Sequence, residues 1–341
     1  MTADTLPLSL VHVFLLTAWT LAACSPSGRP ERELRDPPRH AVDTLTHAAD
    51  ALRHADTLQL EVIHSTTFAD ARAVAADPLG FIYVADAGRH VVVKLSARGA
   101  VESVIGGPGS REGEFDEPSG VEATNGLVLF VADANNRRIQ RFSRSNAYLG
   151  SIPLVHDGRA NPDSRVTYRR GEGDLNGFST GRPISVVSSD SKEVYAIDAD
   201  RNIVLNWNED LRLAAVRGDV EAGPGTLAEP VDIAMGARSM VYVADRGRSA
   251  VVVFDQYGSY VRAFGEGRLS DLRSVVVGEG TVFAGHSNHI SLYTTSGMFL
   301  GSMALNLNEP LVDLAITNDA MLLVVTPTRL LRAPIPVPPE P

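Results

Sequence analysis

One pattern recurs along this chain, and its clearest copy is Phe130-Val-Ala-Asp-Ala-Asn-Asn-Arg-Arg-Ile-Gln-Arg-Phe142. Three further copies keep an apolar triplet that ends in an aspartate, followed nine residues later by a bulky apolar residue. They read Tyr83-Val-Ala-Asp-Ala-Gly-Arg-His-Val-Val-Val-Lys-Leu95, Tyr195-Ala-Ile-Asp-Ala-Asp-Arg-Asn-Ile-Val-Leu-Asn-Trp207 and Tyr242-Val-Ala-Asp-Arg-Gly-Arg-Ser-Ala-Val-Val-Val-Phe254. The chain is therefore an array of similar units.

The spacing of the aspartates gives the length of one unit. Asp86 and Asp133 are 47 residues apart, as are Asp198 and Asp245, whereas Asp133 and Asp198 are 65 apart, which is one unit plus an insertion of 18. Each unit holds four short segments rich in Val, Ile, Tyr and Phe, bounded by Gly, Asp and Pro, as is typical of strands and turns. A sheet with two apolar faces needs cover on both, and radial packing of several sheets provides it. We therefore expect an all-β propeller.

The residues around the best copy resemble the NHL repeat family of six-bladed β-propellers. The strand Phe130-Val-Ala-Asp133 and the preceding Pro-x-Gly-Val segment (Pro118 to Val121) match the pattern of that family, as do Asn136 and Arg138. The resemblance covers residues 58–336. It implies a six-bladed β-propeller of four-stranded antiparallel blades, and it implies no particular activity, because one fold serves many functions.

Six blades follow from this pattern, and the last two are degenerate. The fifth has Val282-Phe-Ala-Gly285 in place of the aspartate motif, and the sixth has Leu323-Val-Val-Thr326 there and lacks an outer strand. Leu58–Ile63 precedes the first blade and has no blade of its own. We expect this N-terminal strand to complete the last blade and close the ring. The expected blades span 72–105, 118–152, 183–216, 230–264, 272–303 and a last one from 310.

Composition narrows the range of functions. The chain has 341 residues, 44% of them hydrophobic, and a net charge of −10. Unspecific nucleic-acid binding needs clustered Lys and Arg, so we expect no nucleic-acid partner. The chain has a single cysteine, which excludes an intrachain disulfide and a cysteine-based zinc site.

That cysteine lies in an N-terminal segment with the features of an export signal. Residues 11–23 form an apolar run that is too short for a confident membrane span, and the run closes with Leu21-Ala-Ala-Cys24. This closing motif resembles the lipobox of bacterial lipoproteins, which implies a signal peptide at 1–23 and lipidation of Cys24; an ordinary signal peptide with a chance cysteine is the alternative. Residues 24–57 then form a flexible tether and a short helix, and 337–341 a Pro-rich tail.

The lipobox also bears on location. The resemblance implies an extracytoplasmic, membrane-anchored lipoprotein, on the periplasmic or the surface side. Because residue Ser25 is not an aspartate, the usual sorting rule of that class favours the outer membrane.

The start of each innermost strand offers candidate ligand contacts. It lies 13 residues before the repeat aspartate, or before Thr326 in the sixth unit, and should face a central channel. The family pattern favours glycine there, so two aspartates at this position depart from it. With arginines nearby they could bind a cation or a polar ligand, or else line a hydrated channel with mutually satisfied charges. The positions are Ala73, Gly120, Ser185, Asp232, Arg273 or Ser274, and Asp313; the candidate ligand-binding residues are Asp232, Asp313, Arg72, Arg182 and Arg273.

The four repeat aspartates have a structural interpretation, because an aspartate at a strand end caps a loop by accepting backbone N–H groups. In the fifth blade His286 and His289 take their place. Two histidines could supply two zinc ligands but a third is needed, with His90 and His156 the remaining candidates, so we expect no metal site. Six-bladed amidating lyases hold a metal with three histidines, and gluconolactonase-like propellers hold calcium with an acid and asparagines; neither pattern is visible here.

The insertion at 155–177 lies on the same face as the channel mouth and the loops that join the blades. Long loops within tight arrays are usually functional or disordered, so four of its arginines, Arg159, Arg165, Arg169 and Arg170, are candidate contacts for a partner. We expect a lipid-anchored propeller that binds a protein partner or a small ligand on this face, with no resident cofactor. The alternative is a metal-dependent lyase or lactonase-like enzyme that uses zinc or calcium on the same face.

Overall fold

A computed structural model of the chain describes residues 57–63, 68–156 and 179–335. All of them belong to one compact unit. Within these ranges the chain forms β-strands and two short 3-10 helices, η1 (Val220–Gly225) and η2 (Ala237–Ser239). None of the helices in the described ranges has the length and apolarity that crossing a membrane requires.

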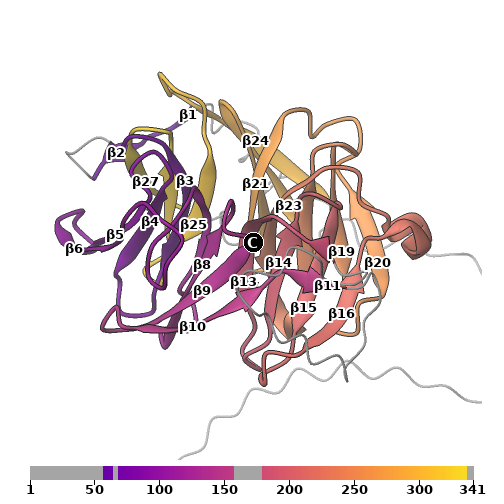
Figure 1. The fold of residues 1–341 in the computed structure, drawn as a ribbon. Coiled ribbons are helices and arrows are strands. Elements are labelled where there is room, and N and C mark those ends of the chain that lie inside the picture. The colour runs from indigo at the N-terminus through magenta and orange to yellow at the C-terminus, as the bar shows by residue number, and fades with distance from the viewer. Residues whose placement is uncertain (1–56, 64–67, 157–178, 336–341) are drawn as a thin grey trace, which may run out of the picture. The chain divides into compact units, whose positions relative to one another are not determined.

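The described residues form a six-bladed β-propeller of antiparallel blades, as the sequence predicts. In each blade the first strand is innermost and the later strands follow outwards in chain order (Figure 1). Blade 1 contains β3 (Ala71–Ala76), β4 (Ile82–Asp86), β5 (Val91–Leu95) and β6 (Val101–Gly106); blade 2 contains β7 (Pro118–Glu122), β8 (Val128–Asp133), β9 (Arg138–Ser143) and β10 (Tyr148–Pro153); blade 3 contains β13 (Pro183–Ser188), β14 (Val194–Asp198), β15 (Ile203–Trp207) and β16 (Leu213–Arg217).

The other three blades continue the array. Blade 4 contains β17 (Pro230–Met235), β18 (Val241–Asp245), β19 (Ala250–Phe254) and β20 (Tyr260–Phe264); blade 5 contains β21 (Leu272–Gly278), β22 (Thr281–His286), β23 (His289–Thr294) and β24 (Phe299–Leu305); blade 6 contains β25 (Asp313–Ile316), β26 (Met321–Val325) and β27 (Leu330–Pro334). A two-stranded sheet of β11 (Val155–His156) and β12 (Ser179–Thr180) flanks the insertion.

The hydrophobic core lies between blades, because both faces of each sheet are apolar. The second and third strands are buried along nearly their whole length, while the fourth strand of each blade is partly exposed. One cluster joins Val84 and Val93 of blade 1 to Leu323 and Val325 of blade 6. The first and last blades therefore pack side by side, as the indigo and yellow strands show in Figure 1.

The N-terminal strand closes the ring, in a more extensive way than expected. β2 (Glu61–Val62) pairs antiparallel with β27 and supplies the missing outer strand of blade 6, which confirms the prediction. In addition, β1 (Thr57–Leu58) pairs parallel with β24 and becomes a fifth strand of blade 5. The segment thus joins the outer edges of two blades, and the buried side chain of Leu58 packs in the cluster between them.

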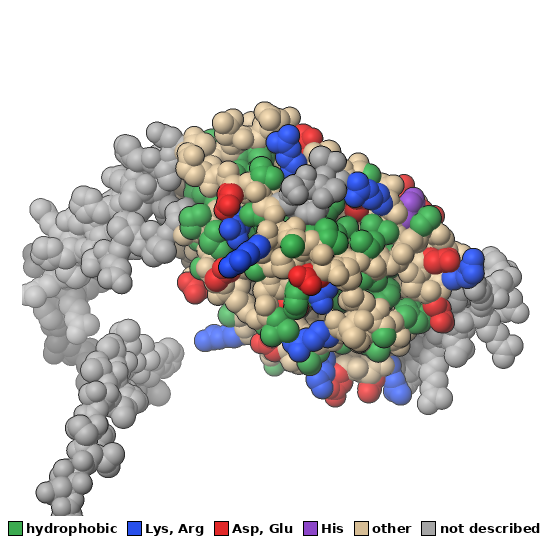
Figure 2. Space-filling view, turned by 90° about the vertical axis from the view of Figure 1, so that its left-hand side faces the viewer, with side chains coloured by type: hydrophobic (Ala, Val, Ile, Leu, Met, Phe, Trp, Pro, Cys, Tyr) green, Lys and Arg blue, Asp and Glu red, His purple; other side chains and the backbone are tan. Residues whose placement is uncertain are grey.

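Charge is distributed rather than concentrated on the surface. On the face shown in Figure 2, acidic and basic side chains are interspersed, with hydrophobic side chains between them. This face presents no large single-sign patch that would recruit a highly charged polymer.

Several predicted features lie outside the described residues. They are the signal peptide at 1–23, Cys24, the tether and helix at 24–57 apart from residue 57, the arginines of the insertion at 155–177, and the tail at 337–341. For these the sequence-based predictions stand untested.

Candidate functional site

The repeat aspartates fasten the start of each blade to the end of its second strand. Asp86 accepts hydrogen bonds from the backbone N–H groups of Ala69 and Asp70, both at 3.0 Å. Asp245 accepts them from Ala228 and Glu229 at 2.9 and 2.8 Å. All four aspartates have no exposed surface. The structural interpretation is therefore correct, although the main partner is the segment before the first strand rather than the loop that follows the aspartate.

Blades 5 and 6 make the same connection with other groups. In blade 5, His286 pairs with Leu272, the position that the repeat aspartate takes elsewhere. Its Nδ1 lies 2.7 Å from the carbonyl oxygen of Ser270. His286 therefore donates a hydrogen bond to the segment before the first strand, whereas the repeat aspartates accept hydrogen bonds from that segment. In blade 6, Thr326 holds this position and donates to the carboxylate of Glu309 at 2.8 Å. The connection is kept although the residue types differ.

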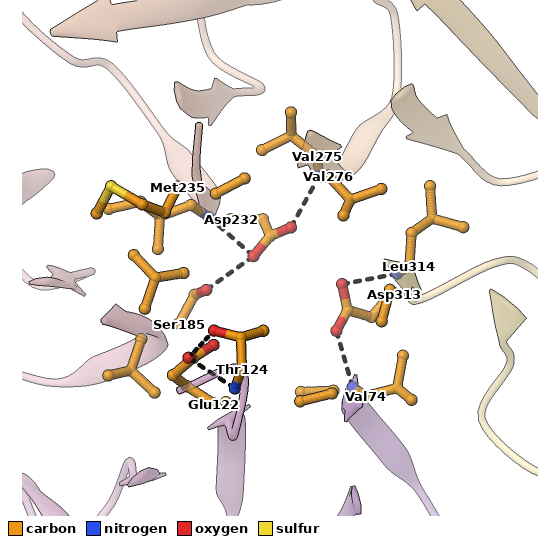
Figure 3. A pocket seen from close by; sticks show the side chains of 18 of the residues that line it. Val74, Glu122, Thr124, Ser185, Asp232, Met235, Val275, Val276, Asp313 and Leu314 are labelled. Atoms are coloured by element: carbon orange, nitrogen blue, oxygen red, sulfur yellow. Dashed lines mark hydrogen bonds between the residues drawn. The ribbon is translucent and has the colours of Figure 1, made fainter. Parts of the chain in front are cut away.

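The first strands enclose a central cavity of about 460 Å³. Several polar side chains line it, and Figure 3 shows Asp232 and Asp313 pointing into it from blades 4 and 6. A register shift between Pro230 and Asp232, repeated in most blades, turns the start of the first strand towards the axis. In blade 5 Ser274, rather than Arg273, takes the ring position, because Ser274 contacts both aspartates.

The structure brings Asp232 and Asp313 together through one serine. The Oγ atom of Ser274 lies 2.9 Å from Asp232 Oδ2 and 2.7 Å from Asp313 Oδ1. Asp232 also accepts hydrogen bonds from Ser185 Oγ and from the backbone N–H of Val275, at 2.7 and 2.8 Å. The two carboxyl groups thus connect blades 3 to 6, and a further bond from the backbone N–H of Val74 to Asp313 Oδ2, at 2.8 Å, reaches blade 1.

These contacts require a proton on one carboxyl group. The hydroxyl of Ser274 has one hydrogen and can donate it to only one of the two aspartates. The second short contact is favourable only if the other carboxyl group donates to Ser274. Burial and, to a smaller extent, the nearby charge of Asp232 raise the pKa of Asp313 to about 8. At neutral pH, Asp313 therefore holds the proton and donates it to Ser274, which donates to Asp232.

The three candidate arginines bind acids of the channel rim instead of the ring aspartates. Arg72 donates to Asp70 at 2.6 and 2.8 Å. Arg273 lies 3.3 Å from Asp271, and Arg182 lies 3.4 Å from Asp200. Arg72 and Arg273 line the mouth of the cavity. The sequence places two of these pairs two residues apart, so the pairing could have been expected from spacing alone.

A third carboxyl group in the cavity was missed from sequence. Glu122 of β7 lies two residues beyond ring position Gly120 and is only 4% exposed. Its Oε1 accepts hydrogen bonds from Ser188 Oγ and the backbone N–H of Thr124, at 2.9 and 3.0 Å, and from the hydroxyl of Thr124. Burial raises the pKa of this carboxyl group. An acid on an innermost strand, where other blades have Ala or Val, is the pattern that could have revealed it.

The histidines are placed for structure in the described part of the chain. His286 and His289 stack with ring centroids 4.0 Å apart. Both nitrogens of His286 have partners, Ser270 at Nδ1 and the hydroxyl of Ser291 at Nε2, 3.2 Å away. His90 Nδ1 accepts the backbone N–H of Glu117 at 3.1 Å. The described residues contain no group of three His, Cys, Asp or Glu side chains arranged to hold a metal ion.

Comparison with known proteins agrees with the architecture. No protein-family profile matches the chain. A segment of 91 residues is 30% identical to NHL repeat-containing protein 3 of Mus musculus, and it spans about a quarter (26%) of the length of each protein. The expected NHL-type repeat thus has a counterpart in sequence over part of the chain.

Solved structures show the fold over a larger part of the chain. A gluconolactonase from Xanthomonas campestris has a TM-score of 0.59 at 14% identity, covering 92% of this chain and 99% of that one. A virginiamycin B lyase from Staphylococcus aureus has 0.55 at 11%, covering 82% and 89%. The WD40 repeats of RRP9 have 0.54 at 14%, covering 82% and 79%. At these identities the likeness is one of fold alone.

Proposed function

We propose that this chain is a lipid-anchored, extracytoplasmic binding protein that takes a small ligand into the central cavity of its propeller. The observation that carries the proposal is the cavity itself. Its volume of about 460 Å³ falls in the range that small-molecule sites occupy, roughly 300–1,000 Å³. Aliphatic side chains of the first strands share its walls with convergent polar groups, among them carboxyl groups with raised pKa values, a combination that is common in ligand sites.

The proposal can be tested by blocking the cavity. Ala75 lines it from β3, so Ala75→Phe should fill part of the space, whereas Ala97→Phe adds the same side chain at an exposed position. The full-length protein and both variants are incubated with a small-molecule extract and examined by native mass spectrometry. We expect a ligand of a few hundred daltons on the wild type and on Ala97→Phe, and none on Ala75→Phe. A wild type without ligand, or a ligand that survives Ala75→Phe, contradicts the proposal.

The membrane anchor is part of the proposal and rests on the lipobox resemblance around Cys24. Cys24→Ser removes the only thiol that could carry the lipid. We expect this variant to leave the outer-membrane fraction, and we expect processing of the wild type to be sensitive to globomycin. Retention of Cys24→Ser in that membrane would rule out lipidation as the anchor.

A protein partner is a second candidate, favoured by the length of the insertion. Residues 157–178 interrupt an array whose other connections are short, and long loops of this kind often bind partners. Removing 159–177 should then abolish capture of the partner by the tethered protein. The metal-dependent lyase or lactonase alternative gains no support from the described residues, because both nitrogens of His286 are already bonded.

A further inference from the structure

The cavity holds carboxyl groups at two levels along its axis. Asp313 stands at the ring level near the mouth, and Glu122 stands two residues further along its own strand than the ring position Gly120. Two residues of a strand rise about 7 Å, which sets the axial separation of the two levels. Figure 3 shows Glu122 and Asp313 on different walls of the cavity, on blades 2 and 6 with Val74 of blade 1 between them. A ligand that touches both therefore crosses the cavity obliquely.

Glu122 and Asp313 can each accept a further hydrogen bond. Glu122 is more than nine-tenths buried, and its bonds from Ser188 and Thr124 all go to Oε1, so Oε2 accepts none from the described residues. Asp313 Oδ2 accepts a single bond, from the backbone N–H of Val74. By contrast, each oxygen of Asp232 already accepts two. The free acceptors are thus one oxygen at each level.

The cavity supplies no positive charge to these acids. Among the described residues its only basic lining residues are Arg72 and Arg273 at the mouth, which are bonded to Asp70 and Asp271. Burial raises the pKa of Glu122 and Asp232, and that of Asp313 to about 8, because no cation offsets the loss of solvent. A bound cation would reverse this effect and let the carboxyl groups ionise.

Around Glu122 the wall is hydrocarbon. Ala75, Val187 and Val276 hold the same position on their own strands as Glu122 does on β7, and they offer no side-chain donor or acceptor. One free acceptor thus stands at the ring level, and the second stands in an otherwise apolar belt two residues further along the strands. A complementary ligand has a positive group at each end and a methylene chain between them.

We propose that the cavity binds a short aliphatic diamine, with one ammonium group on Asp313 and the other on Glu122. This inference deepens the proposed function and rests on it. An ammonium group donates three hydrogen bonds, so it satisfies the free oxygen at either end, and a chain of about four methylene groups covers the apolar wall. Because the ammonium replaces the proton that Asp313 shares with Ser274, binding near neutral pH releases about one proton.

Titration calorimetry on the purified full-length protein tests the inference, with butane-1,4-diamine as the probe. Butan-1-amine has one charge fewer and butane-1,4-diol has none, so both serve as matched ligands. We expect the diamine to bind at least roughly tenfold more tightly than the monoamine, the effect of one charged hydrogen bond, and the diol not to bind measurably. Titrations in buffers of different ionisation enthalpy should show the proton release.

Two variants test which carboxyl group binds each ammonium group of the diamine. Glu122→Gln should reduce the affinity for the diamine to that for the monoamine, and Asp313→Asn should abolish the proton release. Thermal unfolding confirms that each variant is folded. Equal affinity for diamine and monoamine, an unchanged ratio in Glu122→Gln, or no binding of either amine overturns the inference. The proposed function survives this failure if the cavity-blocking experiment still reveals a ligand, and falls only if that experiment also fails.

Discussion

At the scale of single residues, the repeat aspartate is the most informative position in the chain. It is buried, and it accepts hydrogen bonds from the backbone N–H groups of the segment that enters its own blade. An N–H group buried without an acceptor costs about 1–3 kcal/mol, so the aspartate explains why the unit repeats with this residue. Its conspicuous presence in sequence reflects folding rather than ligand chemistry.

Replacing one such aspartate should therefore destabilise the propeller. In Asp245→Ala the N–H groups of Ala228 and Glu229 lose their acceptors, and we expect the free energy of unfolding to fall by about 3 kcal/mol. Asp210→Ala, at an exposed position, is the matched control and should change it by less than about 0.5 kcal/mol. Urea unfolding measures both. Equal losses would contradict the role assigned to the repeat aspartate.

Much of the ring could be predicted by counting residues, and the exceptions have physical causes. Counting back 13 residues finds Asp232 and Asp313. In blade 5 it leaves Arg273 and Ser274 open, and the structure selects Ser274 because the hairpin there is one residue shorter. The bridge from Asp232 through Ser274 to Asp313 was not predictable, because three blades supply it and only the closed ring brings them together. Glu122, by contrast, was missed although an acid on an innermost strand, where the other blades have Ala or Val, is visible in the sequence.

The shared proton predicts a pH dependence of stability. The pKa of Asp313 is about 8 in the folded state and about 3.9 in an unfolded chain, so the folded protein binds the extra proton between these values. That contribution is complete at low pH and is lost as the pH rises towards 8. We expect the wild type to lose stability relative to Asp313→Asn between pH 5 and pH 8, as followed by urea unfolding. Parallel profiles would show that Asp313 does not hold the proton.

At the scale of elements, the short N-terminal segment of β1 and β2 pairs with two different blades. Its two strands have two residues each, too few to be read as separate strands from sequence, and β1 was therefore not foreseen. The segment pairs with β24 and β27, which are the outer strands of the last two blades. A ring closed in this way has no terminal blade free to separate from its neighbours.

Removing this closure should loosen the ring more than removing the tether does. Deleting residues 59–64 removes β2 together with the backbone bond from Ile63 to Leu330, and it separates β1 from the blades. We expect the thermal midpoint to fall by about 10 °C, the effect of roughly 4 kcal/mol in a domain of this size. Deleting 25–39, which precedes the propeller, should leave the midpoint unchanged. A tether deletion that destabilises equally would refute the closing role.

At the scale of the whole molecule, the diameter of the ring is set by how closely the first strands approach. Four of the six ring positions hold Ala, Gly or Ser, and the two aspartates replace bulk with hydrogen bonds to adjoining blades. The cavity exists because these side chains are short while the apolar contacts between blades lie further from the axis. The residues at the six ring positions thus determine both the diameter of the ring and the size of the cavity.

Gly120 tests this dependence, because it packs directly against the backbone of blade 3. A Cβ atom there would lie 2.9 Å from the Cα of Ser185 and 3.0 Å from the carbonyl oxygen of Ile184. Both are backbone atoms, so no side-chain rotation relieves the contact and the two blades must move apart. We expect Gly120→Ala to lower the free energy of unfolding by about 1–3 kcal/mol.

The control variant, Ser185→Ala, adds no atoms to the contact between blades 2 and 3. Ser185→Ala removes only the hydrogen bond to Asp232 and leaves the contact between blades 2 and 3 as it is, so we expect a loss nearer 1 kcal/mol. Separation of the blades in Gly120→Ala should also lengthen the path across the cavity and weaken any ligand that touches both sides, which Ser185→Ala should not do. Chemical denaturation and ligand titration on the same variants decide the point. A Gly120→Ala protein with wild-type stability would mean that the ring adjusts freely, and that its diameter is not fixed by the first strands.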